Sequence, residues 1–116
     1  MNFITVMRET LELDEKQINR YLDDLNYIDQ FLKKHDIEIP SWICAQFCNH
    51  IIMLLQRLEN DECAQIEYYD ESEDMIDDKF KELAIDFLKP LFNKYHIKIK
   101  EEEILLIAIY FQAFTS

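Results

Sequence analysis

The residues best suited to chemistry lie in the stretch Ser41–Glu59, which reads SWICAQFCNHIIMLLQRLE and is otherwise mostly apolar. It carries His50, whose imidazole ring is a titratable base, and Arg57, a permanent cation seven residues further on. Seven residues make nearly two turns of an α-helix, so the two side chains are predicted to lie along one line. A nearby cation lowers the pKa of an imidazole and binds an anion attached to its ring. The pair therefore suits a histidine that accepts a phosphoryl group.

The rest of this stretch predicts a mostly buried helix with one narrow polar stripe. The arc opposite His50 is filled by apolar side chains: Ile43, Phe47, Ile51, Leu54, Leu55 and Leu58. Four side chains fall near the line of His50 and Arg57: Gln46, Asn49, Met53 and Gln56. Two simpler interpretations stay open, because one histidine on an apolar helix is commonly a core residue with satisfied hydrogen bonds. Arg57 could also be a surface residue, or pair with Glu59 or with an acid elsewhere.

Two cysteines near His50 raise the alternative of a metal site. Cys44 and Cys48 share one helix face, but helical geometry turns His50 away from them by more than about 90°. Free cysteine is also a common small core residue. We therefore expect no metal ligands, no cofactor and no catalytic residues, and we expect the three cysteines to be free thiols in a reducing cytoplasm.

The composition excludes several classes of function. The chain has 116 residues, which predicts one domain, and its 24 acidic and 12 basic residues give a net charge of -12. Such a charge repels phosphate backbones and anionic membranes, so we expect no direct nucleic-acid binding and no membrane binding. The absence of glycine argues against an all-β fold and against Gly-rich phosphate loops. No signal-peptide pattern opens the chain, and the longest apolar run, Ile104–Phe111, is too short to span a bilayer.

Apolar residues at three- and four-residue spacing predict an all-α fold, a compact bundle of about four to five helices. The helices are predicted at Asp14–His35, Ser41–Glu59, Lys79–Tyr95 and Glu101–Phe114, with a kink at Pro90 in the third. Residues 1–13 are predicted to be an N-terminal arm, either extended or a frayed helical turn, and residues 14–116 the helical domain. The motifs HDIEIP and YHIKIK, each between two helices, suggest two helical hairpins.

The long polar stretch Asn60–Asp78 is predicted to be a solvated loop. A calcium loop is the alternative, but the stretch lacks the glycine and the terminal glutamate spacing of an EF-hand. His35 and His96 lie near predicted helix ends, where a histidine complements the helix dipole and needs no further role.

With these residues in place, the chain resembles the PRD, the phosphotransferase-system regulation domain of bacterial regulators. The family has a helix with a "DHI" core and a downstream arginine, and Asn49-His50-Ile51 and Arg57 occupy those places. Two later motifs are also similar to the family's, namely ELAI at Glu82–Ile85 and EILLIAIYF at Glu103–Phe111. The resemblance covers roughly Asp14–Phe114 and implies a PRD-like helical fold.

The resemblance implies a stand-alone, non-enzymatic cytoplasmic module that acts through protein contacts in transcriptional or sugar-uptake regulation. It implies a homodimer, formed through apolar helix faces, and phosphorylation of His50 by the phosphocarrier protein or by sugar-permease subunits. Arg57 and Asn49 would support that histidine. Asn49 replaces the family's usual aspartate, and Tyr110 stands where the family has its second histidine. A one-site switch follows, and the alternative is an interaction subunit that is not phosphorylated.

Overall fold

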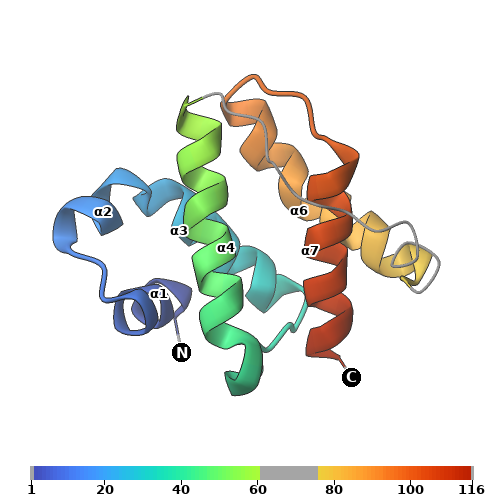
Figure 1. Ribbon diagram of the computed structural model, residues 1–116, viewed down its shortest axis with the longest axis horizontal. Helices are drawn as coiled ribbons and strands as arrows, with labels where there is room; N and C mark the ends of the chain where they lie inside the picture. Colours follow the sequence, from blue (N-terminus) through green and yellow to red (C-terminus); the bar gives the residue numbers. More distant parts are fainter. Residues whose placement is uncertain (1, 61–75, 116) are drawn as a thin grey trace. The chain divides into compact units, whose positions relative to one another are not determined.

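The computed structural model describes residues 2–60 and 76–115, and their regular structure is entirely helical (Figure 1). The helices are α1 (Phe3–Leu11), α2 (Glu15–Arg20), α3 (Leu22–Lys34), α4 (Ser41–Asn60), α6 (Asp78–Lys94) and α7 (Glu101–Phe114). The predicted all-α class is confirmed, with six helices in the described part where four to five were expected. The chain divides into two compact units, Met1–Gln56 and Arg57–Ser116, and α4 runs from the first into the second.

The N-terminal residues form a helix, although the sequence favoured an arm. The Asn2 side chain caps α1 by accepting a hydrogen bond from the N–H of Ile4 at 2.7 Å. The helix packs against α3 and buries Phe3 and Met7. The rings of Phe3 and Phe47 pack edge to face, with their centroids 6.1 Å apart. Two apolar anchors in one short helix gave too weak a periodicity to be recognised. The boundary between residues 13 and 14 stays a prediction.

The predicted helix Asp14–His35 is two helices, α2 and α3, because the helical conformation is interrupted at Tyr21. The predicted capping box is confirmed: the Gln17 N–H donates to Asp14 Oδ1 at 2.9 Å, and the Asp14 N–H donates to Gln17 Oε1 at 3.2 Å. Tyr21 then leaves helical geometry, at φ -112° and ψ 18°, while its side chain stays buried. The apolar spacing continues across this residue, so periodicity alone did not reveal the break.

One buried carboxylate fastens α1 to α3. Asp29, on α3, accepts a hydrogen bond from the N–H of Phe3 at 2.9 Å and forms an ion pair with Lys33 at 2.9 Å. Burial by itself raises the pKa of Asp29, but the Phe3 N–H and the Lys33 ammonium outweigh that effect, and the pKa lies below its ordinary value. The charged form of Asp29 therefore stabilises the docked position of α1.

The two units share a helix–link–helix pattern, which agrees with the sequence echo. The helix before the link is α3 in the first unit and α6 in the second. Shortly after it comes one residue in the left-handed region, Asp36 at φ 53° or His96 at φ 58°. The next N–H then bonds back to the helix, from Ile37 to the Leu32 carbonyl at 2.8 Å and from Ile97 to the Phe92 carbonyl at 3.0 Å. These equivalent caps lead through a short irregular link into α4 and α7 respectively.

The second unit is built on the pairing of α6 with α7 (Figure 1). The rings of Phe87 and Phe111 meet edge to face with centroids 5.4 Å apart, beside the fully buried Ala84. The Asp77 N–H, before α6, donates to Gln112 Oε1 of α7 at 3.0 Å. The helix continues through Pro90, which is exposed, and the predicted kink there stays a prediction.

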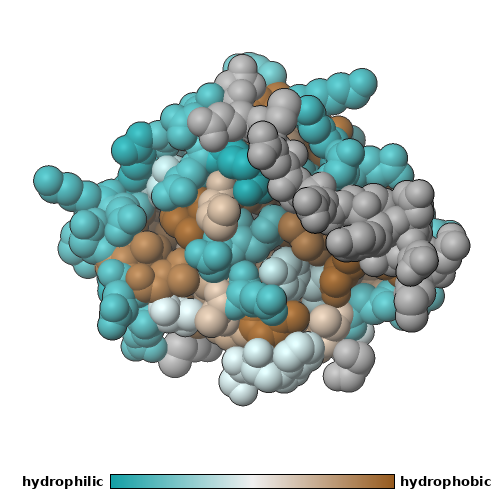
Figure 2. Space-filling model, in the orientation of Figure 1, coloured by the Kyte–Doolittle hydropathy of each residue, from teal (hydrophilic) through white to brown (hydrophobic). Residues whose placement is uncertain are grey.

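Most of the predicted polar loop, including the calcium-loop alternative, lies outside the described residues. Hydrophilic side chains cover much of the face drawn in Figure 2, and hydrophobic side chains appear between them in patches. None of the described helices is both long enough and apolar enough to cross a membrane.

Asp29→Asn should make the protein less stable at neutral pH by about 1–2 kcal/mol, because it removes a charge that the fold stabilises. The folded state lowers the pKa of Asp29. Its contribution is therefore present above the ordinary Asp value of about 3.9 and is lost as pH falls through the lower folded-state pKa. Urea unfolding at several pH values measures the difference, which should vanish in acid. Asp23→Asn, at an exposed site on the same helix, is the control and should leave the stability unchanged.

Candidate functional site

Helix α4 places His50 at the border between a buried and an exposed face. All six apolar residues predicted for the opposite arc are buried: Ile43, Phe47, Ile51, Leu54, Leu55 and Leu58. His50 and Arg57 are half-buried. The amphipathic pattern of the helix is therefore confirmed. The buried arc borders His50 and does not lie opposite it, because Ile43 and Leu54 are seven and four residues from His50 and so lie on its side of the helix.

The exposed side of α4 carries no charge, in a protein that is 31% charged. Five of its exposed side chains repeat at alternating intervals of four and three residues: Trp42, Gln46, Asn49, Met53 and Gln56. We call these five residues the α4 stripe. Trp42 is 70% exposed and Met53 is 47% exposed, which is high for large apolar side chains. His50 lies next to Asn49 along the border of the stripe.

One ring nitrogen of His50, Nε2, is buried. The residue as a whole is half-buried, and its Nε2 atom has no contact with solvent. Any reaction at Nε2 therefore requires the ring, or the groups that cover it, to move first.

Arg57 pairs with Glu103, the third residue of α7, which lies 46 positions further along the chain. The Arg57 Nη2 and Glu103 Oε1 atoms are 2.7 Å apart, and the two side chains are 17% and 4% exposed. The sequence left open whether Arg57 was a surface residue or paired with Glu59 or another acid. In the structure, Arg57 pairs with Glu103, an acid far along the chain, and this largely buried ion pair lies within the second unit.

Burial raises the pKa of Glu103, although the Arg57 guanidinium opposes that rise. The sequence predicted only that the acidic opening of this helix would complement its dipole. A further signal was present, because Glu103 lies four residues before the buried Ile107 and therefore on the inner face. Sequence reasoning missed this role of Glu103.

Tyr110, at the position where the family resemblance expects a second histidine, is half-buried on α7. Burial raises the pKa of its phenol above the ordinary value of about 10, so the side chain is neutral at physiological pH. A neutral phenol does not provide the nucleophilic nitrogen of an imidazole.

Cys44 and Cys48 face each other on α4, with their sulfur atoms 3.9 Å apart. Burial, together with the neighbouring Cys44 thiol, raises the pKa of Cys48 to about 12, so that thiol is protonated at neutral pH. Within the described ranges, no group of three or more His, Cys, Asp or Glu side chains is placed to hold a metal ion.

Arg57→Met should cost about 3–5 kcal/mol of stability, because it leaves the Glu103 carboxylate buried without its cation. Replacing both residues, in Arg57→Met/Glu103→Leu, should recover most of that loss, because an apolar pair has no charge to desolvate. The pKa of Glu103 is already raised, and loss of Arg57 raises it further. The deficit of the single variant should therefore shrink as pH falls and Glu103 becomes protonated. Urea unfolding across pH measures both effects.

The matched control is Arg8→Met, which breaks an exposed Arg–Glu pair, Arg8–Glu15 at 3.2 Å. Its side chains are 44% and 73% exposed, so the loss should stay below about 1 kcal/mol. Equal losses from the two arginine variants would contradict the importance of burial at Arg57.

Comparison with known proteins supports the resemblance noted in the sequence. The model of the PRD domain family matches residues 25–114, which includes His50, Arg57, Glu103 and Tyr110. No match was found among curated proteins or among solved structures. The matched segment covers well over half of the chain and agrees with its all-α structure, and the chain therefore belongs to the PRD domain family.

Proposed function

We propose that this protein is a cytoplasmic regulatory module that accepts a phosphoryl group on His50 from a phosphotransferase-system protein. PRD domains are regulatory and take part in phosphotransferase-dependent control of transcription. The observation that carries the proposal is the family match across the helix that bears His50. The output would be a change in protein contacts that affects transcription or sugar uptake, with no reaction catalysed by the module itself.

The position of His50 supports this role in two ways. The residue is partly accessible, as a phosphoacceptor must be, and it lies at the border of the firmly buried face of its helix. Phosphorylation would place about two negative charges beside a surface stripe that has none. A charge change of that size at an uncharged surface would alter what the surface can bind.

Arg57 is proposed to be a supporting cation that is shared with Glu103. A guanidinium has five N–H donors, and the ion pair with Glu103 uses the Nη2 side of the group. The donors that remain could interact with an anion while the carboxylate fixes the side chain. Asn49, exposed one residue before His50, would offer a neutral amide where the family usually has a carboxylate.

The α4 stripe is proposed to be the contact surface of a homodimer. Two copies of a chain with net charge -12 repel each other, so a surface without acidic side chains favours a contact between them. The stripe is such a surface, and its exposed tryptophan and methionine are residue types that protein interfaces favour. Its alternating four- and three-residue spacing also suits packing against another helix.

The alternative is an interaction subunit that is not phosphorylated. Three observations favour it: neutral Asn49 before the histidine, the buried Nε2 atom of His50, and neutral Tyr110 at the second position. In this alternative the protein still makes contacts through the α4 stripe, but phosphorylation of His50 does not regulate them. Phosphotransfer therefore distinguishes the two functions.

Incubation with phosphoenolpyruvate and the purified phosphotransferase proteins should label the protein with acid-labile phosphate, because phosphohistidine is hydrolysed in acid. His50→Ala should abolish the label. His35→Ala and His96→Ala remove the other two histidines, which are exposed, and should label like the wild type. Equal labelling of His50→Ala and wild type would contradict His50 as the acceptor, and no labelling of any form would favour the interaction subunit.

Met53→Glu should weaken self-association by at least about tenfold, because it places like charges opposite each other in the proposed contact. Sedimentation velocity over a range of concentrations measures the change. Trp42, the only tryptophan, gives a second measurement, since its fluorescence should shift to the blue as the dimer forms.

Ile85→Glu is the matched control, because Ile85 is 38% exposed but lies on α6, outside the stripe. It should leave self-association unchanged. A monomer at all concentrations, or equal effects of the two variants, would show that the stripe does not form the proposed contact.

A further inference from the structure

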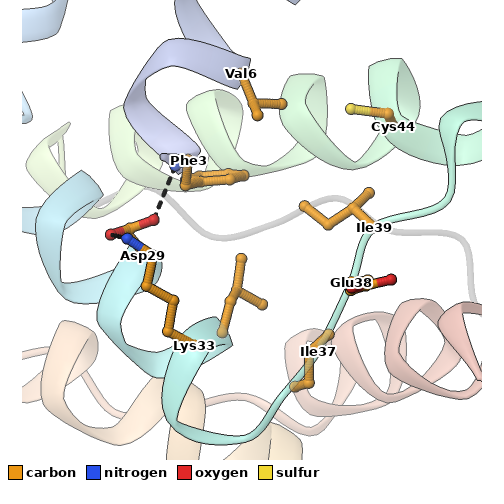
Figure 3. Close-up of a pocket in the computed structure, with 9 residues that line it drawn as sticks. Phe3, Val6, Asp29, Lys33, Ile37, Glu38, Ile39 and Cys44 are labelled. Carbon is orange, nitrogen blue, oxygen red and sulfur yellow. Dashed lines mark hydrogen bonds and ion pairs between the residues drawn. The ribbon is translucent and has the colours of Figure 1, made fainter. Parts of the chain in front are cut away.

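A cavity of about 330 Å³ lies in the first unit, beside α4, and it is partly open to solvent. It is bounded by α1, by the C-terminal half of α3 and by the link into α4. Figure 3 shows the side chains of Phe3, Val6 and Ile39 directed into the space, and the sulfur of Cys44 at the α4 wall. The wall also includes Asp29, Leu32, Lys33, Ile37 and Glu38. A thiol is therefore accessible from an opening in the protein.

A second thiol lies close to the first. Cys48 is fully buried, and its sulfur is 3.9 Å from that of Cys44. Two sulfurs at that separation, each about 2.3 Å from a shared ion, would subtend an angle of about 116° at the ion. That angle lies between the ideal tetrahedral and trigonal values, so both thiols could bind one ion without a change in the helix backbone.

We propose that Cys44 and Cys48 form a two-sulfur binding site for a soft, thiophilic metal ion, which enters through the cavity. Thiolate ligands select soft ions over hard ones. The sulfurs come from consecutive turns of one helix, so they are preorganised, and the cavity leaves the other coordination positions open to water or a small thiol. The site is distinct from His50 and does not depend on its phosphorylation.

The chemistry of binding balances without an oxidant or reductant. A divalent ion displaces one proton from each thiol, forms two metal–sulfur bonds and releases both protons to solvent. The acidic chain attracts the cation, and the cavity wall supplies two carboxylates, Asp29 and Glu38, against one ammonium, Lys33. No electron is transferred, and no third protein ligand is needed.

The proposal differs from the metal site that the sequence argued against. That site also required His50, which helical geometry turns away from the two cysteines, and no three-residue cluster is present in the described part of the chain. Sequence reasoning treated the cysteines as core residues, because neither the cavity beside Cys44 nor the distance between the sulfurs can be read from spacing. An ion at this site would join two consecutive turns of α4 immediately before His50.

Cadmium is a suitable probe, because thiolate-to-cadmium bonds produce a charge-transfer absorption band in the ultraviolet. The parent protein for the titration is Cys63→Ser, so that the third cysteine of the sequence does not contribute. One equivalent of Cd²⁺ should produce the band and raise the melting temperature. Cys44→Ala and Cys48→Ala should each weaken Cd²⁺ binding by more than about tenfold, because one thiolate is lost.

Cys44 is only half-buried, so Cys44→Ala should fold normally even if Cys48→Ala does not, and circular dichroism checks both. Access through the cavity has its own test, because bound Cd²⁺ should protect Cys44 from alkylation by iodoacetamide. Val6→Phe, which narrows the cavity, should slow Cd²⁺ uptake. The proposal is overturned if the parent shows no band at one equivalent, or if Cys44→Ala binds Cd²⁺ as tightly as the parent.

Discussion

Burial of one arc of α4 is the constraint on which the rest of the structure depends. This helix buries more apolar side chains than any other described helix, including the fully buried Phe47, Ile51 and Leu55. Each side chain of that size contributes about 1.5–3 kcal/mol when it leaves water. Once that arc is turned inward, the orientations of His50, of the α4 stripe and of the two cysteine sulfurs are all decided together. One helix therefore carries three features of different chemistry: the histidine, the uncharged stripe and the pair of thiols.

Two buried carboxylates show how the same residue type is used in opposite ways. Asp29 receives a backbone N–H and an ammonium, so its pKa is lowered and its charge stabilises the docking of α1. Glu103 is more deeply withdrawn from water, so burial outweighs the Arg57 guanidinium and its pKa is raised. The first carboxylate favours the folded state as pH rises, and the second opposes it. Both contacts join helices that the sequence alone does not place together.

The absence of charge on the exposed side of α4 links the structure to the proposed function. A net charge of -12 disfavours self-association, and a surface without charged side chains lessens the local repulsion. His50 lies at the edge of that neutral surface, where a phosphoryl group would have a large electrostatic effect. The phosphorylation-dependent contact that we propose rests on family membership and on this placement, while Asn49 and Tyr110 mark how this chain differs from the usual two-histidine pattern.

The sequence by itself determined the helical class, the location of α4, α6 and α7, the capping box at Asp14 and the family, because helix periodicity and caps are local properties of the chain. It did not determine that residues 3–11 form a docked helix, that Arg57 pairs with Glu103, or that Cys44 borders a cavity. Each of these depends on which residues far apart in the chain are brought together when apolar faces leave water. Spacing along a helix predicts which way a side chain points, but only tertiary packing decides what it meets.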